Sequence, residues 1–252
     1  MQEPRCMKML TLLFLCLIPT HLLLGQNSPF QKVNSKDWIY GGTSLVLLGG
    51  STWSRYSTKP YSVENLPVLN ISDLPRYDRK VPMFWSPSHD RASDFLAIGA
   101  LALPFLTLTN SGARHDGFKL AHMYFQALAL TVSLTDFTKT AIKRDRPFMY
   151  GSLAPLSDKT HASARLSFPS GHTSTSAAMA FFSARTFTSY SDNTRINALV
   201  WTGAALYPAF MGYLRIRAGK HFISDVVAGY ILGAAIGYLI PTLHKSKNFV
   251  IQ

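Results

Sequence analysis

The sequence predicts an all-α protein: a transmembrane helical bundle with about five or six spanning helices. Hydrophobic residues make up 47% of the 252-residue chain and charged residues only 15%, well below the usual share of about a quarter. Long apolar segments follow one another, and mostly short polar connections separate them. A soluble bundle with very apolar buried helices is the alternative. The apolar segments are about 93–110, 118–138, 173–190, 196–214 and 222–241.

The first 25 residues have the pattern of a targeting segment. Arg5 and Lys8 precede an apolar run that ends near residue 25, which is the arrangement of a signal peptide. The cleavage site is poor, because residues 23–25 read Leu-Leu-Gly. We therefore expect residues 1–25 to be a signal peptide or an uncleaved N-terminal anchor. Both cysteines, Cys6 and Cys16, lie in this segment, so no disulfide or Cys-based zinc site is expected beyond it.

Residues 26–92 divide into a short apolar segment and a polar stretch. The apolar segment, 38–50, has 13 residues, whereas a spanning helix needs about 20. We expect it to be interfacial, re-entrant or extended by its neighbours. Residues 51–92 hold five prolines and several charged residues and are expected to form a polar extramembrane loop. Pro87-Ser88-His89 is assigned to that loop.

The remaining residues, 93–252, are expected to form a helical core. Segments 118–138 and 196–214 have the length of a spanning helix. Segment 173–190 is less apolar and carries Arg185, so it is expected to face protein rather than lipid. Residues 139–171 form a long basic loop that is rich in Pro, Gly and Ser.

The first of three polar motifs lies where the 118–138 helix is expected to end. Lys139 and Arg146 are seven residues apart, and Pro147 follows directly. Seven residues are two helical turns, so the two cations would share a face of a helix. Proline disfavours helix at the preceding residue, which indicates that the chain leaves the helix near Arg146. Two fixed cations suit a phosphate group, although a charge run at a helix end is more often only solvated.

The second motif, Pro169-Ser170-Gly171-His172, lies where a loop enters an apolar helix. Ser170 suits the N-cap position, and Gly171 lets the backbone approach a ligand closely. Free N–H groups at a helix N-terminus bind phosphate oxygens. His172 at this place could give a proton to a leaving oxygen. An ordinary serine cap beside a bystander histidine is the alternative.

The third motif joins Arg215, His221 and Asp225. His221 and Asp225 are four residues apart and would share one helical face. A carboxylate bonded to one imidazole nitrogen fixes the tautomer and leaves the other nitrogen free to attack. Asp225 opens an apolar segment, where a carboxylate is costly without a partner. A structural His–Asp pair would explain this motif equally well if it stood alone.

In chain order the motifs read K-x6-R-P, P-S-G-H and R-x5-H-x3-D between residues 139 and 225. This combination resembles the type 2 phosphatidic acid phosphatase superfamily. That superfamily includes membrane lipid phosphatases, soluble bacterial class A acid phosphatases and vanadium haloperoxidases. One position departs from the family pattern: Leu214 stands where the family usually has a serine, a lesser member of the phosphate pocket.

The resemblance implies a role for each matching residue. His221 would be the nucleophile that forms a phosphohistidine, and Asp225 would orient it. His172 would protonate the leaving alkoxide and then activate water. No metal and no cofactor would be needed. The residues expected to hold the phosphate are Lys139, Arg146, Ser170, Gly171 and Arg215.

The expected function is removal of phosphate from a membrane lipid: lipid A, undecaprenyl pyrophosphate, phosphatidylglycerol phosphate or phosphatidate. The net charge of +12 agrees with an anionic membrane or substrate. The interleaving of basic and apolar stretches disfavours a nucleic-acid partner. The alternatives are a soluble periplasmic acid phosphatase of broad specificity, a vanadate-dependent haloperoxidase, and a lipid-binding or transport protein with an inactive site.

Alternation of the predicted helices places all three motifs and the 51–92 loop on one membrane face. A cleaved signal followed by a non-spanning 38–50 segment puts that face in the periplasm. An uncleaved anchor followed by a spanning 38–50 segment puts it in the cytoplasm. The export-like start of the chain, together with the usual placement in the family that it resembles, favours a bacterial inner-membrane protein whose active site faces the periplasm.

Overall fold

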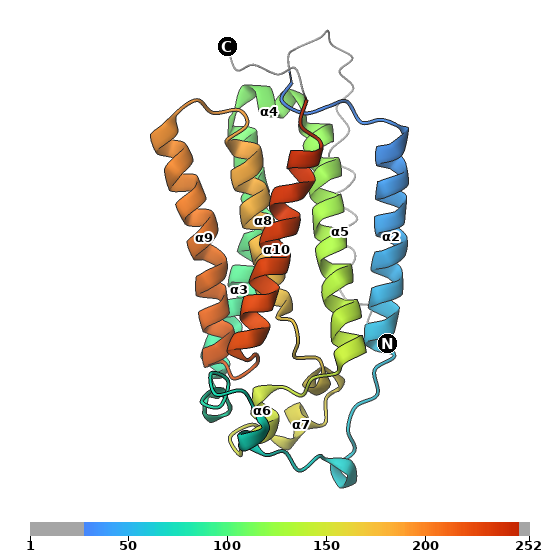
Figure 1. Cartoon of the computed structure of the whole chain (residues 1–252), viewed down its shortest axis with the longest axis vertical. Helices are drawn as coiled ribbons and strands as arrows, with labels where there is room; N and C mark the ends of the chain where they lie inside the picture. The colour runs from blue at the N-terminus through green and yellow to red at the C-terminus, as the bar shows by residue number, and fades with distance from the viewer. Residues whose placement is uncertain (1–27, 247–252) are drawn as a thin grey trace.

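The computed structural model of the chain describes residues 28–246. These residues form helices and connections, with one isolated β-bridge between Phe30 and Lys245, so the all-α prediction is confirmed. The expected signal peptide or anchor at 1–25 lies outside the described residues. Six long helices run along the bundle (Figure 1). They are α2 (Ser35–Tyr56), α3 (Pro87–Ala102), α5 (Gly117–Ile142), α8 (Gly171–Phe187), α9 (Thr194–Arg217) and α10 (Ile223–Leu243).

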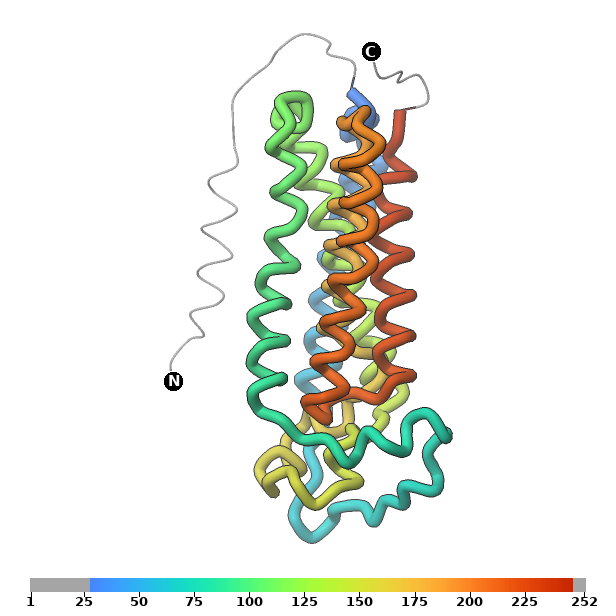
Figure 2. Tube along the Cα trace, turned by 90° about the vertical axis from the view of Figure 1, so that its left-hand side faces the viewer, coloured from blue at the N-terminus to red at the C-terminus, as the bar shows by residue number. Residues whose placement is uncertain are grey.

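These long helices alternate in direction. One end of the bundle therefore gathers the C-termini of α2, α5 and α9 and the N-termini of α3, α8 and α10 (Figure 1). Both long connections, 57–86 and 143–170, lie at this end (Figure 2), which we call the loop end. The second connection contains α6 (Pro147–Tyr150) and α7 (Leu156–Lys159), whereas the opposite end carries α4 (Ser111–His115).

Helix α2 is longer than the apolar segment that predicted it. Residues 38–50 form the middle of a 22-residue helix, so of the three readings of this segment the extended one is observed. Asn34 and Asp37 form a capping box at the start of the helix, which satisfies two otherwise free N–H groups. At the other end Ser54 bonds Thr140 (2.9 Å) and Arg55 pairs with Asp136 (3.3 Å), both on α5.

The polar stretch 51–92 is not a single loop. Its first six residues belong to α2, and the loop prediction for Pro87-Ser88-His89 is wrong, because these residues form the first turn of α3. Pro87 takes the first helical position, where its missing N–H costs nothing. The Ser86 hydroxyl accepts from the backbone N–H of His89. The connection between α2 and α3 therefore covers 57–86.

Helix α8 occupies the centre of the bundle and packs against α3, α5, α9 and α10. Most of its residues are buried, including most of the Ser and Thr residues that made 173–190 a weak membrane span. Small side chains let its neighbours approach closely. A Cβ on Gly233 of α10 would lie 1.9 Å from the carbonyl oxygen of Ser174, and one on Gly237 would lie 2.2 Å from that of Ala178. The α8–α10 contact therefore depends on glycine.

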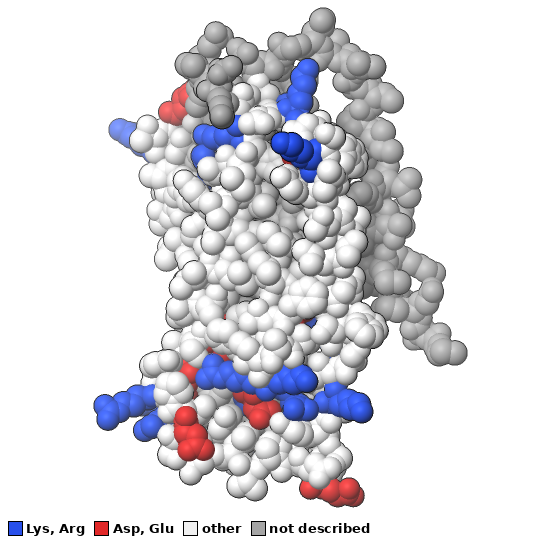
Figure 3. Space-filling model, turned by 45° about the vertical axis from the view of Figure 1, so that its right-hand side comes forward, with Lys and Arg blue, Asp and Glu red and all other residues white. Residues whose placement is uncertain are grey.

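The outer surface of the bundle is apolar between its two ends. Figure 3 shows Lys, Arg, Asp and Glu gathered at both ends of the visible face, with a largely uncharged belt between them. Large apolar side chains along the helices are exposed, among them Val46 of α2, Phe95 of α3, Leu199 of α9 and Ile231 of α10. Among the described residues, Pro87–Thr109 and Ile223–Leu243 are long and apolar enough to cross a membrane. The expected count of five or six spans stays a prediction.

We expect Gly233→Ala to destabilise the protein by about 1–3 kcal/mol, because the added methyl group forces α10 away from the Ser174 carbonyl. The measurement is the free energy of unfolding of the purified protein in detergent. Gly203→Ala on α9 is the matched control, because a Cβ there meets no atom within 4 Å. In a helix that control should be neutral or stabilise by up to about 1 kcal/mol. Equal losses in the two variants would contradict the packing argument.

Candidate active site

The three sequence motifs meet at the loop end of the bundle. One motif comes from the end of α5 and the connection after it, one from the start of α8, and one from the turn between α9 and α10. The side chains that bear charge or could attack are buried or half-buried, although they lie close to the end of the bundle. The structure brings together Lys139, Arg146, Ser170, Gly171, His172, Arg215, His221 and Asp225.

His221 is enclosed by the protein, with 1% of its surface exposed. It lies in the short turn before α10. Gly219 opens this turn with φ of +70°, and a Cβ there would lie 2.1 Å from the carbonyl oxygen of Phe84, so the turn requires glycine. Burial holds the pKa of the imidazole well below its usual value, and the charges of Arg146 and Lys139 lower it further. His221 is therefore neutral near pH 7, with a ring lone pair available for attack.

Positive charge at the site exceeds what nearby carboxylates neutralise. Lys139 Nζ donates to the carbonyl of Leu166 (2.8 Å), and Arg146 Nε donates to that of Ser163 (2.9 Å). Within residues 28–246 no carboxylate lies at ion-pair distance from either cation. Burial and then the charge of Arg215 lower the pKa of Arg146 to about 9. Such a cluster attracts an anion that accepts charge-assisted hydrogen bonds.

The N-terminus of α8 adds backbone donors to this cluster. Ser170 holds the N-cap position, but its hydroxyl bonds Thr173 Oγ1 (2.9 Å) instead of a backbone N–H, so the expected side-chain cap is absent at this described residue. The first-turn N–H groups consequently lack a side-chain acceptor. A Cβ on Gly171 would lie 3.7 Å from Cε of Lys139. Helix N–H groups and an ammonium group thus adjoin, as an anion site requires.

Asp225 does not hydrogen-bond His221 in this structure. Its Oδ2 lies 3.6 Å from Nδ1 of His221, beyond hydrogen-bond distance, and Nδ1 has no hydrogen-bond partner among the described residues. The carboxylate instead accepts from Arg144 Nη1 (2.5 Å), Ser167 Oγ (2.5 Å) and the N–H of Phe222 (2.9 Å). The expected direct bond is not formed, because His221 precedes α10 and these three donors hold the carboxylate.

Arg144 connects Asp225 to the 57–86 connection. Sequence alone does not distinguish it from a solvated charge at the rim of the site. Its Nη2 binds the buried carboxylate of Asp78 (2.9 Å), and its guanidinium lies over the Phe222 ring at 4.2 Å. Asp78 also accepts from the Ser224 hydroxyl at 2.6 Å. This network fixes the start of α10, and therefore Asp225, against two connections distant in sequence.

Helix α3 contributes residues that sequence reasoning missed. Asp90 Oδ1 accepts from Arg215 Nη1 at 2.6 Å, and Ser93 Oγ contacts the same nitrogen at 2.8 Å. One turn later, Asp94 Oδ1 lies 2.9 Å from Nε2 of His172. The available signal was a pair of carboxylates one turn apart at the start of an apolar helix, where each needs a polar partner.

Other polar residues have partners elsewhere in the bundle. Asp136 pairs with Arg55 of α2 at 3.3 Å, and the Arg55 side chain is half exposed. At the opposite end, Asp116 binds Lys119 at 2.7 Å, and His122 contacts the carbonyl of Asp37 at 3.1 Å. The contacts of Asp116 and His122 support the packing of α2, α4 and α5 away from the site, whereas Asp136 lies one turn before Lys139 and its charge acts on that residue.

The model of the PAP2 superfamily matches residues 121–249, just over half of the chain. A PA-phosphatase related-family protein of Dictyostelium discoideum is 30% identical over 164 residues, which are 61% of this chain. The match spans 60% of that relative's length. The crystal structure of the first transmembrane PAP2 type phosphatidylglycerolphosphate phosphatase from Bacillus subtilis superposes with a TM-score of 0.49 at 19% identity. The superposition covers 83% of this chain and 96% of the Bacillus subtilis chain. The resemblance drawn from the motifs is confirmed.

The buried neutral His221 makes stability depend on pH. The pKa of His221 in the folded protein lies below its value of about 6.5 in the unfolded chain. Below about pH 6.5 the unfolded chain therefore binds a proton on His221 that the folded protein does not bind. The stability from this group is complete above about pH 6.5 and is lost as the pH falls. His221→Asn should therefore remove part of the acid sensitivity. As the pH falls below about 6.5, the free energy of unfolding of wild type should decrease relative to that of the variant by up to about 1.4 kcal/mol per pH unit.

The measurement is denaturant unfolding of both proteins between pH 5 and 8. His115→Asn, at an exposed position of the opposite end, is the matched control and should follow the wild-type curve. Parallel pH curves for wild type and His221→Asn would contradict the assignment of a buried neutral imidazole.

Proposed function

Because the chain belongs to the PAP2 superfamily, we propose that it is a metal-independent phosphatase that hydrolyses a phosphate monoester or pyrophosphate of a membrane lipid. The observation that carries the proposal is the excess of positive charge, from Lys139, Arg146 and Arg215, around the buried, neutral imidazole of His221. Phosphoryl transfer depends on positioning and on stabilisation of spread negative charge. Fixed cations and helix N–H groups supply both.

In the first step, a ring nitrogen of His221 attacks phosphorus and forms a P–N bond. The P–O bond of the ester breaks, and its electron pair leaves on the alkoxide oxygen. His172 gives this oxygen its proton. Burial and then the charge of Arg215 lower the pKa of His172 to about 4, and the contact of its Nε2 with Asp94 opposes this shift, because a carboxylate stabilises the protonated imidazole that this step needs. The three cations hold the phosphoryl oxygens throughout.

In the second step, neutral His172 takes a proton from water, and the water oxygen attacks the phosphohistidine. The P–N bond breaks, its electron pair returns to His221, and inorganic phosphate leaves. Asp225 lies 3.6 Å from Nδ1 of His221, so its negative charge stabilises the imidazole ring when phosphorylation makes it positive. Arg144 and Ser167 keep the carboxylate at that place.

The apolar belt supports a membrane lipid as substrate. A lipid phosphate lies at the headgroup level, and the site lies at the loop end, beyond the uncharged belt (Figure 3). Exposed apolar area over a whole bundle is not expected of a soluble acid phosphatase. The candidate substrates remain lipid A, undecaprenyl pyrophosphate, phosphatidylglycerol phosphate and phosphatidate. The proposed location is a bacterial inner membrane, and a loop end in the periplasm requires that the chain enters α2 from the cytoplasmic side.

We expect His221→Ala to lower phosphate release from a panel of these lipids by at least about a thousandfold, because the nucleophile is lost. Vanadate should inhibit the wild-type enzyme, whereas EDTA should not. A rapid quench with radiolabelled substrate should trap an acid-labile phosphoprotein in wild type and none in His221→Ala. Asp73→Asn, an exposed position on the same end, is the control for handling. Substantial phosphate release by His221→Ala would remove the nucleophile assignment.

We expect Asp94→Asn and His172→Ala to act through the leaving group. An alkoxide needs a proton to depart and p-nitrophenolate does not, so His172→Ala should slow alkyl phosphates by about 10²–10⁴-fold and p-nitrophenyl phosphate much less. Asp94→Asn should show the same selectivity with a smaller loss, and the double variant should be no slower than His172→Ala alone. The measurement is kcat/KM for both substrates. Equal losses on both would indicate a structural role instead.

A further inference from the structure

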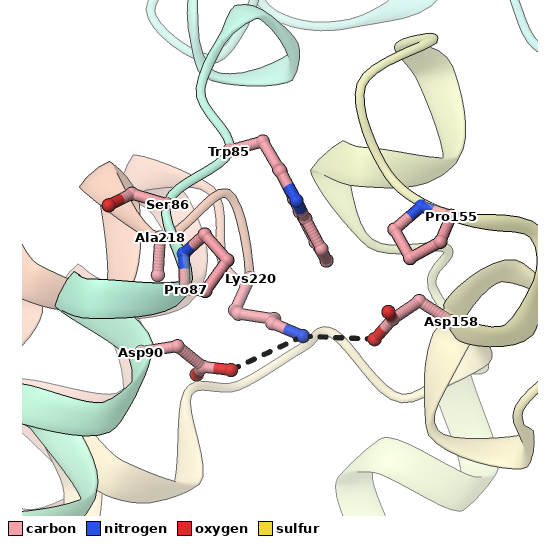
Figure 4. Close-up of a pocket in the computed structure, with 8 residues that line it drawn as sticks. All are labelled: Trp85, Ser86, Pro87, Asp90, Pro155, Asp158, Ala218 and Lys220. Atoms are coloured by element: carbon pink, nitrogen blue, oxygen red, sulfur yellow. Dashed lines mark hydrogen bonds and ion pairs between the residues drawn. The ribbon is translucent and has the colours of Figure 1, made fainter.

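A pocket of about 260 Å³ with both apolar and charged lining residues opens beside the catalytic cluster, outside the helix ends (Figure 4). Its walls come from the end of the 57–86 connection, the start of α3, the α7 region and the turn after α9. Figure 4 shows the ammonium group of Lys220 between the carboxylates of Asp90 and Asp158, near the indole ring of Trp85. Its volume is just below the usual range of ligand pockets, which begins at about 300 Å³, so it has room for a small group rather than a lipid chain.

Two residues join this pocket to the phosphate-binding cluster. Asp90 binds Arg215 Nη1 through Oδ1 (2.6 Å) and lies 3.4 Å from Lys220 Nζ through Oδ2. Lys220 directly precedes His221 in the chain. One wall of the pocket is therefore formed by Asp90 and Lys220, which directly adjoin the phosphate-binding Arg215 and the nucleophile His221. A group attached to a phosphate held by Arg215 extends into this space if it points away from the bundle.

The lining combines an aromatic ring with polar groups that can form further hydrogen bonds. Lys220 Nζ lies 3.2 Å from Asp158 Oδ1 and 4.6 Å from the centre of the Trp85 ring. An ionised carboxylate has about four acceptor sites, and Asp158 uses one of them for Lys220. The pocket thus offers acceptors for hydroxyl protons, an ammonium donor and a flat ring for C–H groups.

The same lining disfavours the other chemical groups of a lipid phosphate. A second phosphate would meet the two carboxylates of Asp90 and Asp158 at close range. An acyl or prenyl chain would cover three charged groups without giving them hydrogen bonds, which costs free energy. A neutral group with several hydroxyls satisfies the charges and covers the indole ring at once.

We propose that this pocket binds the hydroxyl-bearing head group, a sugar or glycerol unit, to which the transferred phosphate is esterified. The inference rests on the phosphatase function proposed above and narrows its substrate class. A phosphorylated glycolipid and a phosphoglycerol lipid both present free hydroxyls beside the phosphate. A prenyl pyrophosphate and phosphatidate do not, so they are expected to be poorer substrates.

The test compares glucose 6-phosphate with n-hexyl phosphate, because both are six-carbon phosphates of a primary alcohol and differ in hydroxyl content. Wild type should prefer glucose 6-phosphate in kcat/KM. Asp158→Asn and Trp85→Ala should each lower the ratio of the two kcat/KM values by about tenfold, mainly through KM for the sugar phosphate. Asp73→Asn is the matched control, an exposed carboxylate on the same end, and should leave the ratio unchanged.

A binding measurement separates this proposal from the catalytic one. In a His221→Ala background, calorimetry should show that Asp158→Asn weakens binding of glucose 6-phosphate about tenfold more than binding of n-hexyl phosphate. Equal weakening for both ligands, or a wild-type enzyme without preference for the sugar phosphate, overturns the pocket assignment. If wild type releases phosphate from neither compound nor from the lipid panel, the phosphatase function fails, and the binding comparison still decides the pocket.

Discussion

The main constraint on the site is the mutual repulsion of buried or half-buried cations that have too few carboxylate partners. Lys139, Arg146 and Arg215 act together on the imidazole of His221, and burial leaves little water to screen them. The fold holds them in place through backbone carbonyls and through Asp90 rather than by full neutralisation. A phosphoryl group completes the charge balance that the protein leaves open. The binding energy for an anion is therefore built into the folded state.

Close packing of α8 against α10 connects this electrostatic arrangement to the bundle. The N–H of Ser170 donates to the carbonyl of Asp225 at 3.0 Å, and a Cβ on Gly229 would lie 2.6 Å from the Ser170 carbonyl. The glycines that let the two helices approach thus also set the separation between the α8 N-terminus and the start of α10. Arg144 fixes the same start from the other side through Asp78 and Asp225. Side chains on separate motifs keep their relative positions because backbone contacts, and not only side-chain contacts, join the helices.

The features that could be predicted from the sequence are those whose evidence is local in the chain. The helices from residue 93 onwards, and the positions of the motifs at their ends, could be predicted because hydropathy and short spacings are local. Arg144–Asp78 and Asp94–His172 could not, since their partners lie 66 and 78 residues apart and no periodicity links them. The length of α2 was hidden for a related reason. Its last turn is polar, and it continues as helix because Ser54 and Arg55 find partners on α5.

That longer helix changes the argument about the membrane face. The periplasmic prediction assumed that residues 38–50 do not span, so that a cleaved signal leaves the whole preceding chain outside. Helix α2 runs the length of the bundle beside α5 (Figure 1), and if its neighbours span, α2 spans too. If the N-terminus of α2 lies outside the cell membrane, the loop end then lies in the cytoplasm. If the N-terminus of α2 lies in the cytoplasm, the loop end lies outside. A periplasmic site and an exported start of α2 therefore exclude each other. The periplasmic proposal stands only with residues that precede α2 on the cytoplasmic side.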